Sequence, residues 1–495
     1  MSLRNDLTDV PGFRVGSAEN AQAATGCTVV LCPEEGAVGG VDQQGGAPGT
    51  RETDPLRPMH LVDRCHAVLL TGGSAFGLEA AGGVTSYLEG RGIGYPTKAA
   101  LVPIVPAAVI YDLAVGDASV RPDAAMGKAA CLEAAKGEKV RTGNVGAGCG
   151  ATVGKANGLE GAMKGGLGTA SAEPVDGILV GAVVAVNAFG DVIDPAVGGI
   201  MAGARIPGAE LDATAFADTM AVLRRRGGES LTFGAPPSNT VIAVVATNAA
   251  LSKQEANILA KMAGAGIART VRPAHTMVDG DTVFTLSSGK ETCDVSFLGA
   301  VAADVLGMAV LSAVIAAKAI QGIPCACDVA GKVRGMRIRP ATPADADAIT
   351  ELAGDLKAWF TPKSGEQIRR DLERYGCLVA EIEDRIVGML IHGPSALHPE
   401  PKLVQVHWMA VALSHRGRGV GQALVRRLEE ICRERGGAVL EVMTVADIDY
   451  YPPYADTRAF YRSTGFDEFY VDAGAKEKYG AEMLYFRKLI EGESS

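Results

Sequence analysis

The sequence PPSNTVIAVVAT at residues 236–247 joins two prolines and a small polar pair to an uninterrupted apolar run. Its β-branched residues do not alternate with polar ones, which predicts a strand over 240–247 that is buried on both faces. The run at 175–186 has the same character, and the Ala-rich stretches 252–263 and 298–319 predict helices. We therefore expect an α/β domain with helices on both sides of the strands, in either one sheet or two stacked sheets.

The composition of the chain changes near residue 335. The first 335 residues hold 58 charged residues, about 17%, and 49 of the 63 glycines, whereas the last 160 hold 46 charged residues, about 29%. A chain of 495 residues is also too long for one compact core. We expect a first domain over 1–330, a short linker at 331–336 and a second domain over 337–490.

Charge and composition limit the classes of function. The net charge of −10 and the pI near 5.4 argue against a nucleic-acid-binding surface, which would need clustered Lys and Arg. The apolar run at 305–317 is shorter than the roughly 20 residues that span a membrane, and the first ten residues lack the apolar segment of an export signal. Ten Cys and seven His show no zinc-binding spacing. We expect a cytoplasmic protein with reduced thiols, no metal, and no nucleic-acid or membrane partner.

Thr240 is the candidate nucleophile. Two prolines stiffen the segment before it, and it is the first residue of a strand, so the position of its hydroxyl is fixed. Such a hydroxyl needs a base, and cleavage of the Asn239–Thr240 peptide bond would supply a free α-amine with a pKa near about 8. The alternative is a Thr that only begins a strand. Asp279 and Asp281 stand two residues apart, so in an extended segment their carboxylates point to one side and suit an ammonium group or a shared proton. The alternative for this pair is a solvated turn.

These residues are part of a longer series of motifs. Their combined order resembles the self-processing aminopeptidase/D-esterase family, which includes the β-aminopeptidases and the endo-type hydrolases of nylon (6-aminohexanoate) oligomers. The resemblance extends over most of residues 6–330. In chain order the motifs are GGSAFGLEA at 72–80, AVIYD at 108–112, VGAGCGATVGK at 145–155, VAVN at 184–187, Asn239-Thr240, and DGDT at 279–282.

The resemblance implies an N-terminal-nucleophile fold, an αββα sandwich, in a chain that cuts itself between Asn239 and Thr240. It makes Thr240 the nucleophile, Asp279 and Asp281 the acidic pair that orients it, and Asn187 the oxyanion donor. Such a set is what acyl transfer from an amide requires. It also implies a homo-oligomer that needs no cofactor and acts on small peptides, β-peptides, esters or amide oligomers. Tyr111 and Lys155 match further polar site residues, although Tyr111 is also compatible with packing and Lys155 with a loop surface.

The second domain contains a glycine-rich turn between a strand and a helix. Its sequence is Arg416-Gly417-Arg418-Gly419-Val420-Gly421. Three spaced glycines expose backbone N–H groups at a helix N-terminus, where the helix dipole favours pyrophosphate, and the two arginines add positive charge. The order of a dinucleotide-binding fingerprint is not met, and a purely structural turn is the remaining alternative.

Residues 337–490 resemble the GNAT acetyltransferases in this loop and in TRAFYRSTGF at 457–466. The resemblance implies acetyl-CoA as cofactor, an amine acceptor, and a mixed α/β domain whose central sheet splays to seat the thioester. Tyr461 matches the Tyr that protonates the departing thiolate. His407 and Glu441 are candidate bases, with a half-buried structural role as the alternative for His407.

Together the two halves predict a bifunctional enzyme, an autoprocessed threonine amidase or aminopeptidase joined to an N-acetyltransferase. We hypothesise that the second domain acetylates amines that the first releases. The alternatives are a protein with one working activity and one binding or regulatory module, and a scaffold protein, which has no need of both motif sets.

Overall fold

The computed structural model divides the chain into two compact units, which are described separately. The first is Met1–Glu210 with Ala215–Asp328, and the main part of the second is Val329–Ser495. The structure describes residues 3–195, 198–209, 211, 215–227, 239–329, 336–356, 359–361, 363–382, 384–395, 402–412, 415, 419–446, 452–479 and 481–491.

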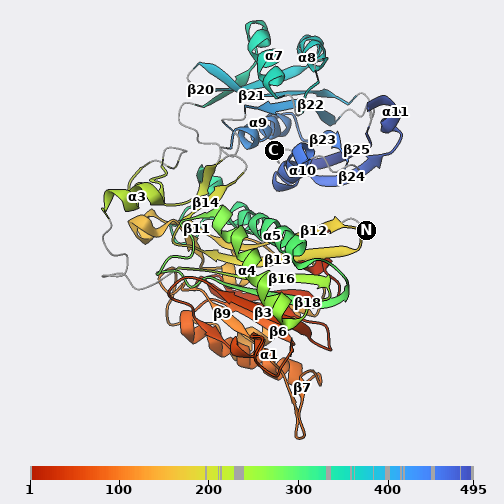
Figure 1. Ribbon diagram of the computed structural model, residues 1–495. Coiled ribbons are helices and arrows are strands. Elements are labelled where there is room, and N and C mark those ends of the chain that lie inside the picture. The colour runs from red at the N-terminus through yellow and green to blue at the C-terminus, as the bar shows by residue number, and fades with distance from the viewer. Residues whose placement is uncertain are drawn as a thin grey trace. The chain divides into compact units, whose positions relative to one another are not determined.

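Two stacked sheets form the centre of the first unit. One helix pair, α4 and α5, covers the larger sheet, and a second pair, α1 and α2, covers the smaller one (Figure 1). The expected αββα sandwich is therefore confirmed. The larger sheet has the order β12 (Gly166–Val175), β13 (Ile178–Asn187), β16 (Thr240–Ala249), β18 (Thr282–Glu291), β3 (Ala37–Gln43), β5 (Arg64–Cys65), and only β16 and β18 are parallel.

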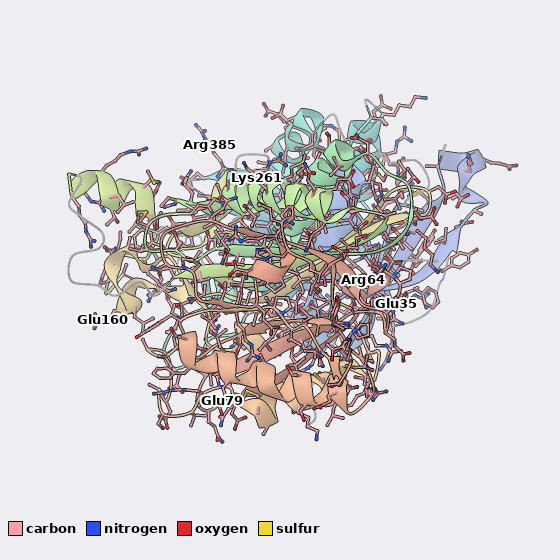
Figure 2. The ribbon with its side chains drawn as sticks, turned by 60° about the horizontal axis from the view of Figure 1, so that its bottom comes forward. Glu35, Arg64, Glu79, Glu160, Lys261 and Arg385 are labelled. Carbon is pink, nitrogen blue, oxygen red and sulfur yellow. A yellow bond between two sulfur atoms is a disulfide. The ribbon has the colours of Figure 1, made fainter. Side chains whose placement is uncertain are left out.

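The smaller sheet and the helices complete the four layers. Its strands β6 and β9 are parallel, and its other neighbours are antiparallel. The elements are β1 (Arg14–Asn20), β2 (Thr25–Leu31), β6 (Ala67–Thr71), β9 (Ala107–Val109) and β4 (Thr50–Arg51) in sheet order, with α1 (Ala80–Glu89), α2 (Ala124–Ala134), α4 (Lys253–Thr270) and α5 (Val295–Ala316). Charged side chains such as Glu79 and Lys261 lie on the outer helix layers, exposed to solvent (Figure 2).

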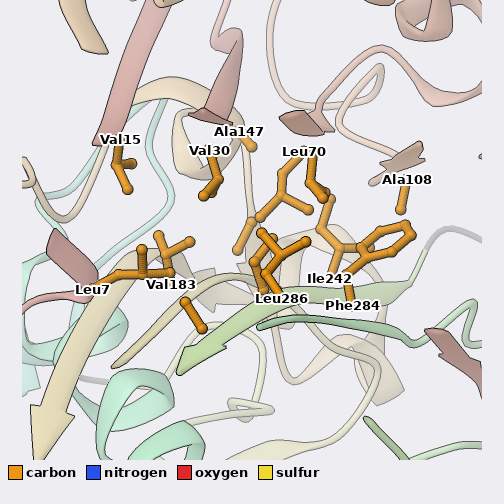
Figure 3. Packing of buried hydrophobic residues seen from close by; sticks show 14 of the residues in the cluster. Leu7, Val15, Val30, Leu70, Ala108, Ala147, Val183, Ile242, Phe284 and Leu286 are labelled. Carbon is orange, nitrogen blue, oxygen red and sulfur yellow. The ribbon is translucent and has the colours of Figure 1, made fainter. Parts of the chain in front are cut away.

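The hydrophobic core lies between the two sheets (Figure 3). Ile242 and Val244 of β16 pack there with Phe284 of β18 and Leu70 of β6, and all four are fully buried. The intervening residues of β16 are fully buried as well, and by the alternation of side chains along a strand they face the helices. Burial on both faces explains why the sequence at 240–247 has no polar alternation.

Helix α5 (Val295–Ala316) confirms the helix expected over 298–319, displaced by three residues toward the N-terminus. Its first turn is capped by Asp294, whose carboxylate accepts hydrogen bonds from the N–H groups of Ser296 at 3.0 Å and Phe297 at 2.9 Å. By length and composition alone α5 is apolar enough to cross a membrane, with a mean hydropathy of 2.1, yet 61% of that window is buried in the structure. It packs against β12, β13 and α4, which accounts for its apolar composition.

The second unit contains a seven-stranded sheet that splays at its centre. Strands β22 and β23 are parallel and pair only between 403–406 and 439–442, although they continue to Val411 and Val445. This confirms the expected GNAT-type sheet. The elements are β19 (Arg337–Pro340), β20 (Gly376–Ile382), β21 (Arg385–Pro394), β22 (Leu403–Val411), β23 (Ala438–Val445), β25 (Met483–Ile490) and β24 (Asp467–Asp472) in sheet order, with α7 (Ala346–Asp355), α8 (Ser364–Leu372), α9 (Val420–Glu434) and α10 (Pro452–Ser463).

The expectation of reduced thiols is wrong for one pair of cysteines. Cys325 and Cys327 form a disulfide, because the turn that opens α6 (Ala326–Val329) brings their Cα atoms to 5.4 Å. The other eight cysteines are free. Within the described residues, the two sulfurs and the carboxylate of Asp328 form the one group whose spacing suits a metal ion. That carboxylate already accepts a hydrogen bond from the Cys325 N–H at 2.8 Å, and oxidised sulfurs offer no thiolate ligand.

Candidate active site

Thr240 is the first residue of β16, at one end of the strand. Its backbone pairs with Asn187, the last residue of β13, so the two side chains lie on the same face of the sheet. Both are buried. The strand register thus places the predicted nucleophile and the predicted oxyanion donor side by side.

The carbonyl of Asn239 accepts two hydrogen bonds. One comes from the Thr240 hydroxyl, and the other comes from the Gly280 N–H at 3.1 Å. The Asn239 side chain is buried and donates to the Val278 carbonyl at 3.4 Å. The peptide bond predicted to break therefore has a hydroxyl against it and a backbone donor on its oxygen.

Asp279 and Asp281 flank this bond from the neighbouring segment. Asn239 forms a parallel bridge with Asp279, and the Val241 N–H donates to Asp281 Oδ1 at 2.7 Å, so Thr240 lies between them in register. Both carboxylates are buried, which excludes the solvated turn. Burial, followed by the charge of Asp281, raises the pKa of Asp279.

Asn187 is held by hydrogen bonds to several neighbouring groups. Its Oδ1 accepts from the Thr152 N–H at 2.9 Å and from Lys155 Nζ at 2.9 Å, and the Thr152 hydroxyl lies 3.4 Å away. Its Nδ2 donates to the Tyr111 carbonyl at 3.1 Å. Tyr111 thus reaches the cluster through its backbone, which its sequence motif did not indicate.

Lys155 lies inside the cluster and not on a loop surface. Its ammonium also donates to the Asn187 carbonyl at 2.9 Å. Burial lowers the pKa of Lys155 to about 7, against the opposing effect of the Asp279 charge. At neutral pH the side chain is therefore close to the midpoint of its titration, where it both donates and accepts protons readily.

The cluster contains the parts that acyl transfer needs: a hydroxyl nucleophile, an acidic pair, an amide, and a lysine with a lowered pKa. All six residues predicted for the first domain meet here, and their individual roles remain predictions. Sequence reasoning missed the N–H of Gly280 and the side chain of His275, which contacts Asp281. The signal for both was their place within or next to the DGDT motif.

In the second unit, the glycine-rich turn leads directly into α9. Gly419 has φ +80° and caps the helix, and Val420 and Gly421 form its first turn. A side chain on Gly421 would press on Met409, 2.9 Å from its Cε, and on Phe460. These features fit a glycine-capped helix N-terminus, the type of backbone arrangement that binds pyrophosphate. Arg416, Gly417 and Arg418 lie outside the described residues.

The predicted catalytic groups of the second unit have contrasting surroundings. Tyr461 is buried among Phe460, Phe466 and Phe486, and this burial raises the pKa of its phenol, which keeps it protonated. Glu441 is fully buried and forms an ion pair with Arg487 at 2.9 Å.

His407 stacks on Tyr375, with ring centroids 4.2 Å apart. Burial lowers the pKa of His407, in spite of the nearby charge of Asp371. The ring is therefore neutral at pH 7, the state that a base requires.

Comparison with known proteins identifies the family that each unit matches. The family model for peptidase family S58 matches residues 5–325. The chain belongs to peptidase family S58. The acetyltransferase (GNAT) family model matches residues 346–466, so the S58 chain carries a C-terminal GNAT domain.

Similar proteins cover the S58 region. An uncharacterised aminopeptidase of Mycobacterium tuberculosis is 44% identical over 343 residues, which span 65% of this chain and 96% of the relative. A 6-aminohexanoate-oligomer endohydrolase of Kocuria sp. is 33% identical over 326 residues, with 62% of this chain and 84% of the relative covered. Among solved structures, a Burkholderia sp. β-aminopeptidase has a TM-score of 0.47 at 22% identity and covers 65% of this chain and 90% of that one.

Proposed function

We propose that this S58 chain cleaves itself before Thr240 and then works as a threonine amidase or aminopeptidase, while its GNAT domain transfers acetyl groups from acetyl-CoA to an amine. The contact of the Thr240 hydroxyl with the Asn239 carbonyl, inside the cluster of Asp279, Asp281, Asn187 and Lys155, carries the hydrolase proposal. The S58 family membership supports the class of activity.

The arrangement around this carbonyl supports self-cleavage. The Thr240 hydroxyl gives up its proton as its oxygen attacks the carbonyl carbon of Asn239, and the oxyanion that forms is stabilised by the Gly280 N–H. The C–N bond then breaks, its nitrogen takes up the proton that the hydroxyl released, and an ester joins the Asn239 carbonyl to the Thr240 oxygen. Water hydrolyses the ester, which leaves an Asn239 carboxylate, a free hydroxyl and a free α-amine on Thr240.

In the cleaved enzyme the Thr240 amine is the base for its own hydroxyl. It removes the proton as the oxygen attacks a substrate amide, and it later gives that proton to the leaving amine. Asn187, which pairs with Thr240 in the sheet, would donate to the substrate oxyanion, and Lys155, bonded to Asn187 and with a pKa of about 7, would supply either a charge or a proton. The acidic pair orients the amine. Small peptides and amide oligomers are the proposed substrates, since one relative is named for 6-aminohexanoate oligomers.

A denaturing gel with N-terminal sequencing tests the hydrolase proposal. Purified protein should give two fragments, the second beginning at Thr240. The Thr240→Ala variant should give one intact chain, while Thr247→Ala, a buried Thr of the same strand, should still be cut. If folded wild-type protein yields only the full-length polypeptide and no fragments, self-cleavage is refuted.

For the GNAT domain, α9, its cap Gly419 and the splay between β22 and β23 fit acetyl-CoA. The N–H groups at 419–421 would hold the pyrophosphate, and the cofactor would supply the activated acetyl group. Tyr461, protonated at neutral pH, would give a proton to the thiolate that leaves. His407 is the better base, because Glu441 is already paired with Arg487.

Substitution at Gly419 tests this assignment. Gly419→Leu forces a side chain into a backbone conformation with φ +80° and should weaken acetyl-CoA binding at least about tenfold, with fragment formation unaffected. Gly436→Leu is the matched control, because Gly436 has φ +86° and lies just beyond the C-terminal end of α9. Loss of fragments together with cofactor binding would contradict the division into two units.

A second candidate is a GNAT domain that binds acetyl-CoA without transferring the acetyl group. The ion pair that occupies Glu441 favours it, since of the two bases predicted from the sequence it leaves His407 alone. Mass spectrometry of amines incubated with protein and acetyl-CoA separates the two candidates. The same assay, run on the hydrolase's own amine products, tests whether the two activities act in sequence.

A further inference from the structure

His275 makes two contacts with one oxygen of the acidic pair. Its ring Nδ1 lies 2.8 Å from Asp281 Oδ2, and its backbone N–H donates to the same oxygen at 3.1 Å. The residue has φ +57°, a conformation that few non-glycine residues adopt. Its side chain is 19% exposed, and that of Asp281 is 3% exposed. An uncommon backbone conformation at a residue that hydrogen-bonds to a buried carboxylate is often found at functional positions.

Burial by itself would lower the pKa of His275, but the hydrogen bond and charge of Asp281, together with the backbone of Gly264 on α4 and the charge of Asp279, outweigh burial, and the pKa is raised. A raised pKa favours the protonated ring, which pairs with the Asp281 carboxylate through Nδ1.

The groups around His275 are mostly acidic. Asp279 and Asp281 stand at the start of β18, and Asp42 of β3 lies near Gly264. The cations nearby are already engaged. Lys155 lies at Asp279 and bonds to Asn187, and Arg272 of β17 (Val271–Arg272) pairs with Asp218 at 3.4 Å.

The position of Asp281 connects this ion pair to the nucleophile. Asp281 Oδ1 accepts from the N–H of Val241, the residue that follows Thr240, and Thr240 lies between Asp279 and Asp281 in register. Two carboxylates beside a new amino terminus stabilise its ammonium form and raise its pKa, so that less of the amine is present as the free base at neutral pH. A cation bound to one of them reduces that effect.

We propose that His275 is a positioning residue that holds Asp281 and balances the negative charge of the acidic pair, so that the amine freed at Thr240 acts as a base at neutral pH. The proposal rests on the proposed self-cleavage. It adds a residue that acts through Asp281 and does not touch the substrate.

His275→Asn is the sharpest variant. Asn tolerates a positive φ, and its amide can donate to Asp281 from the position of Nδ1, so the hydrogen bond is kept while the charge is lost. His275→Ala removes both. His60→Asn is the matched control, since His60 is an exposed residue of the same unit.

The freed amine is titrated by its rate of acylation with trace acetic anhydride as a function of pH, read by mass spectrometry on the peptide that begins at Thr240. His275→Asn should raise the midpoint by about 0.5 to 1 pH unit, the size typical of removing one nearby charge. At pH 7 the neutral, reactive fraction of the amine then falls by roughly three- to tenfold. His60→Asn should leave the midpoint unchanged. A midpoint that stays the same or falls in His275→Asn overturns the proposal.

A second measurement does not depend on cleavage. In the single-chain Thr240→Ala variant, the ring of His275 is titrated by NMR, and its pKa should lie above the usual value of about 6.5. A pKa at or below that value overturns the proposal. Failure of the proposed function shows separately, as the absence of fragments in wild-type protein.

Discussion

Lys164 is a fully buried lysine, and it predicts how the stability of the first unit changes with pH. It belongs to β11 (Met163–Lys164), and its Nζ donates to the carbonyls of Ala151 at 2.6 Å and Gly148 at 3.1 Å. Burial lowers the pKa of Lys164 to about 7, with Cys149 and Asp112 opposing the shift. The folded chain therefore releases this proton near pH 7, whereas the unfolded chain keeps it to about pH 10.4.

The sign of the effect follows from proton counting. Between about pH 7 and 10 the unfolded state binds one more proton than the folded state at this site, so Lys164 makes the free energy of unfolding rise with pH. Its contribution to the slope is about 1.4 kcal/mol per pH unit, or roughly 3 kcal/mol from pH 7.5 to 9.5. This stability is fully present above the unfolded pKa and is lost as the pH falls to about 7. Lys164→Met should lower the measured slope by this amount, while Lys155, whose pKa burial also lowers to about 7, keeps its own contribution.

Urea unfolding of the Thr240→Ala chain, followed by far-UV circular dichroism at several pH values, measures the slope without complication from separate fragments. Trp359 and Trp408, the only tryptophans, both belong to the second unit, so their fluorescence follows that unit alone and should not respond to Lys164→Met. Lys261→Met, on the exposed face of α4, is the matched control. Equal slopes in the Lys164→Met variant and its parent would refute the argument.

The remaining predictions concern one hydrolytic group and the two cores. Asn187→Ala should lower kcat by about 10² to 10³, measured by steady-state hydrolysis, because an oxyanion donor is lost; a change in KM alone would contradict that role. Phe284→Ala should destabilise the first unit by about 3–5 kcal/mol in urea unfolding, through a cavity between the sheets, and a loss under 1 kcal/mol would contradict the packing. Arg487→Met should destabilise the second unit by about 3–5 kcal/mol in Trp fluorescence, since the buried Glu441 loses the cation that balances its charge, and an unchanged transition would contradict the ion pair.

Short-range patterns in the sequence predict most of the fold. The unbroken apolar run after Thr240 predicts a strand covered on both faces, and β16 is such a strand because one set of its side chains meets the other sheet and the alternate set meets helices. The Ala-rich stretch at 298–319 likewise predicts α5, and Asp304, which pairs with Arg269 on the helix surface, does not interrupt it. The bond between Cys325 and Cys327 was not predicted, because it depends on a turn geometry that residue spacing does not give.

Residue type and short-range periodicity are enough to predict the two-unit organisation, the apolar strands, and the motif residues from which the site is assembled. The groups that surround those residues could not be predicted in this way. Strand register places Asn187 beside Thr240, burial brings the pKa of Lys155 to about 7, and His275 meets Asp281 through a strained turn. Hydrogen-bond partners and desolvation arise from segments far apart in the chain, and they exist only once the sheets and helices have packed.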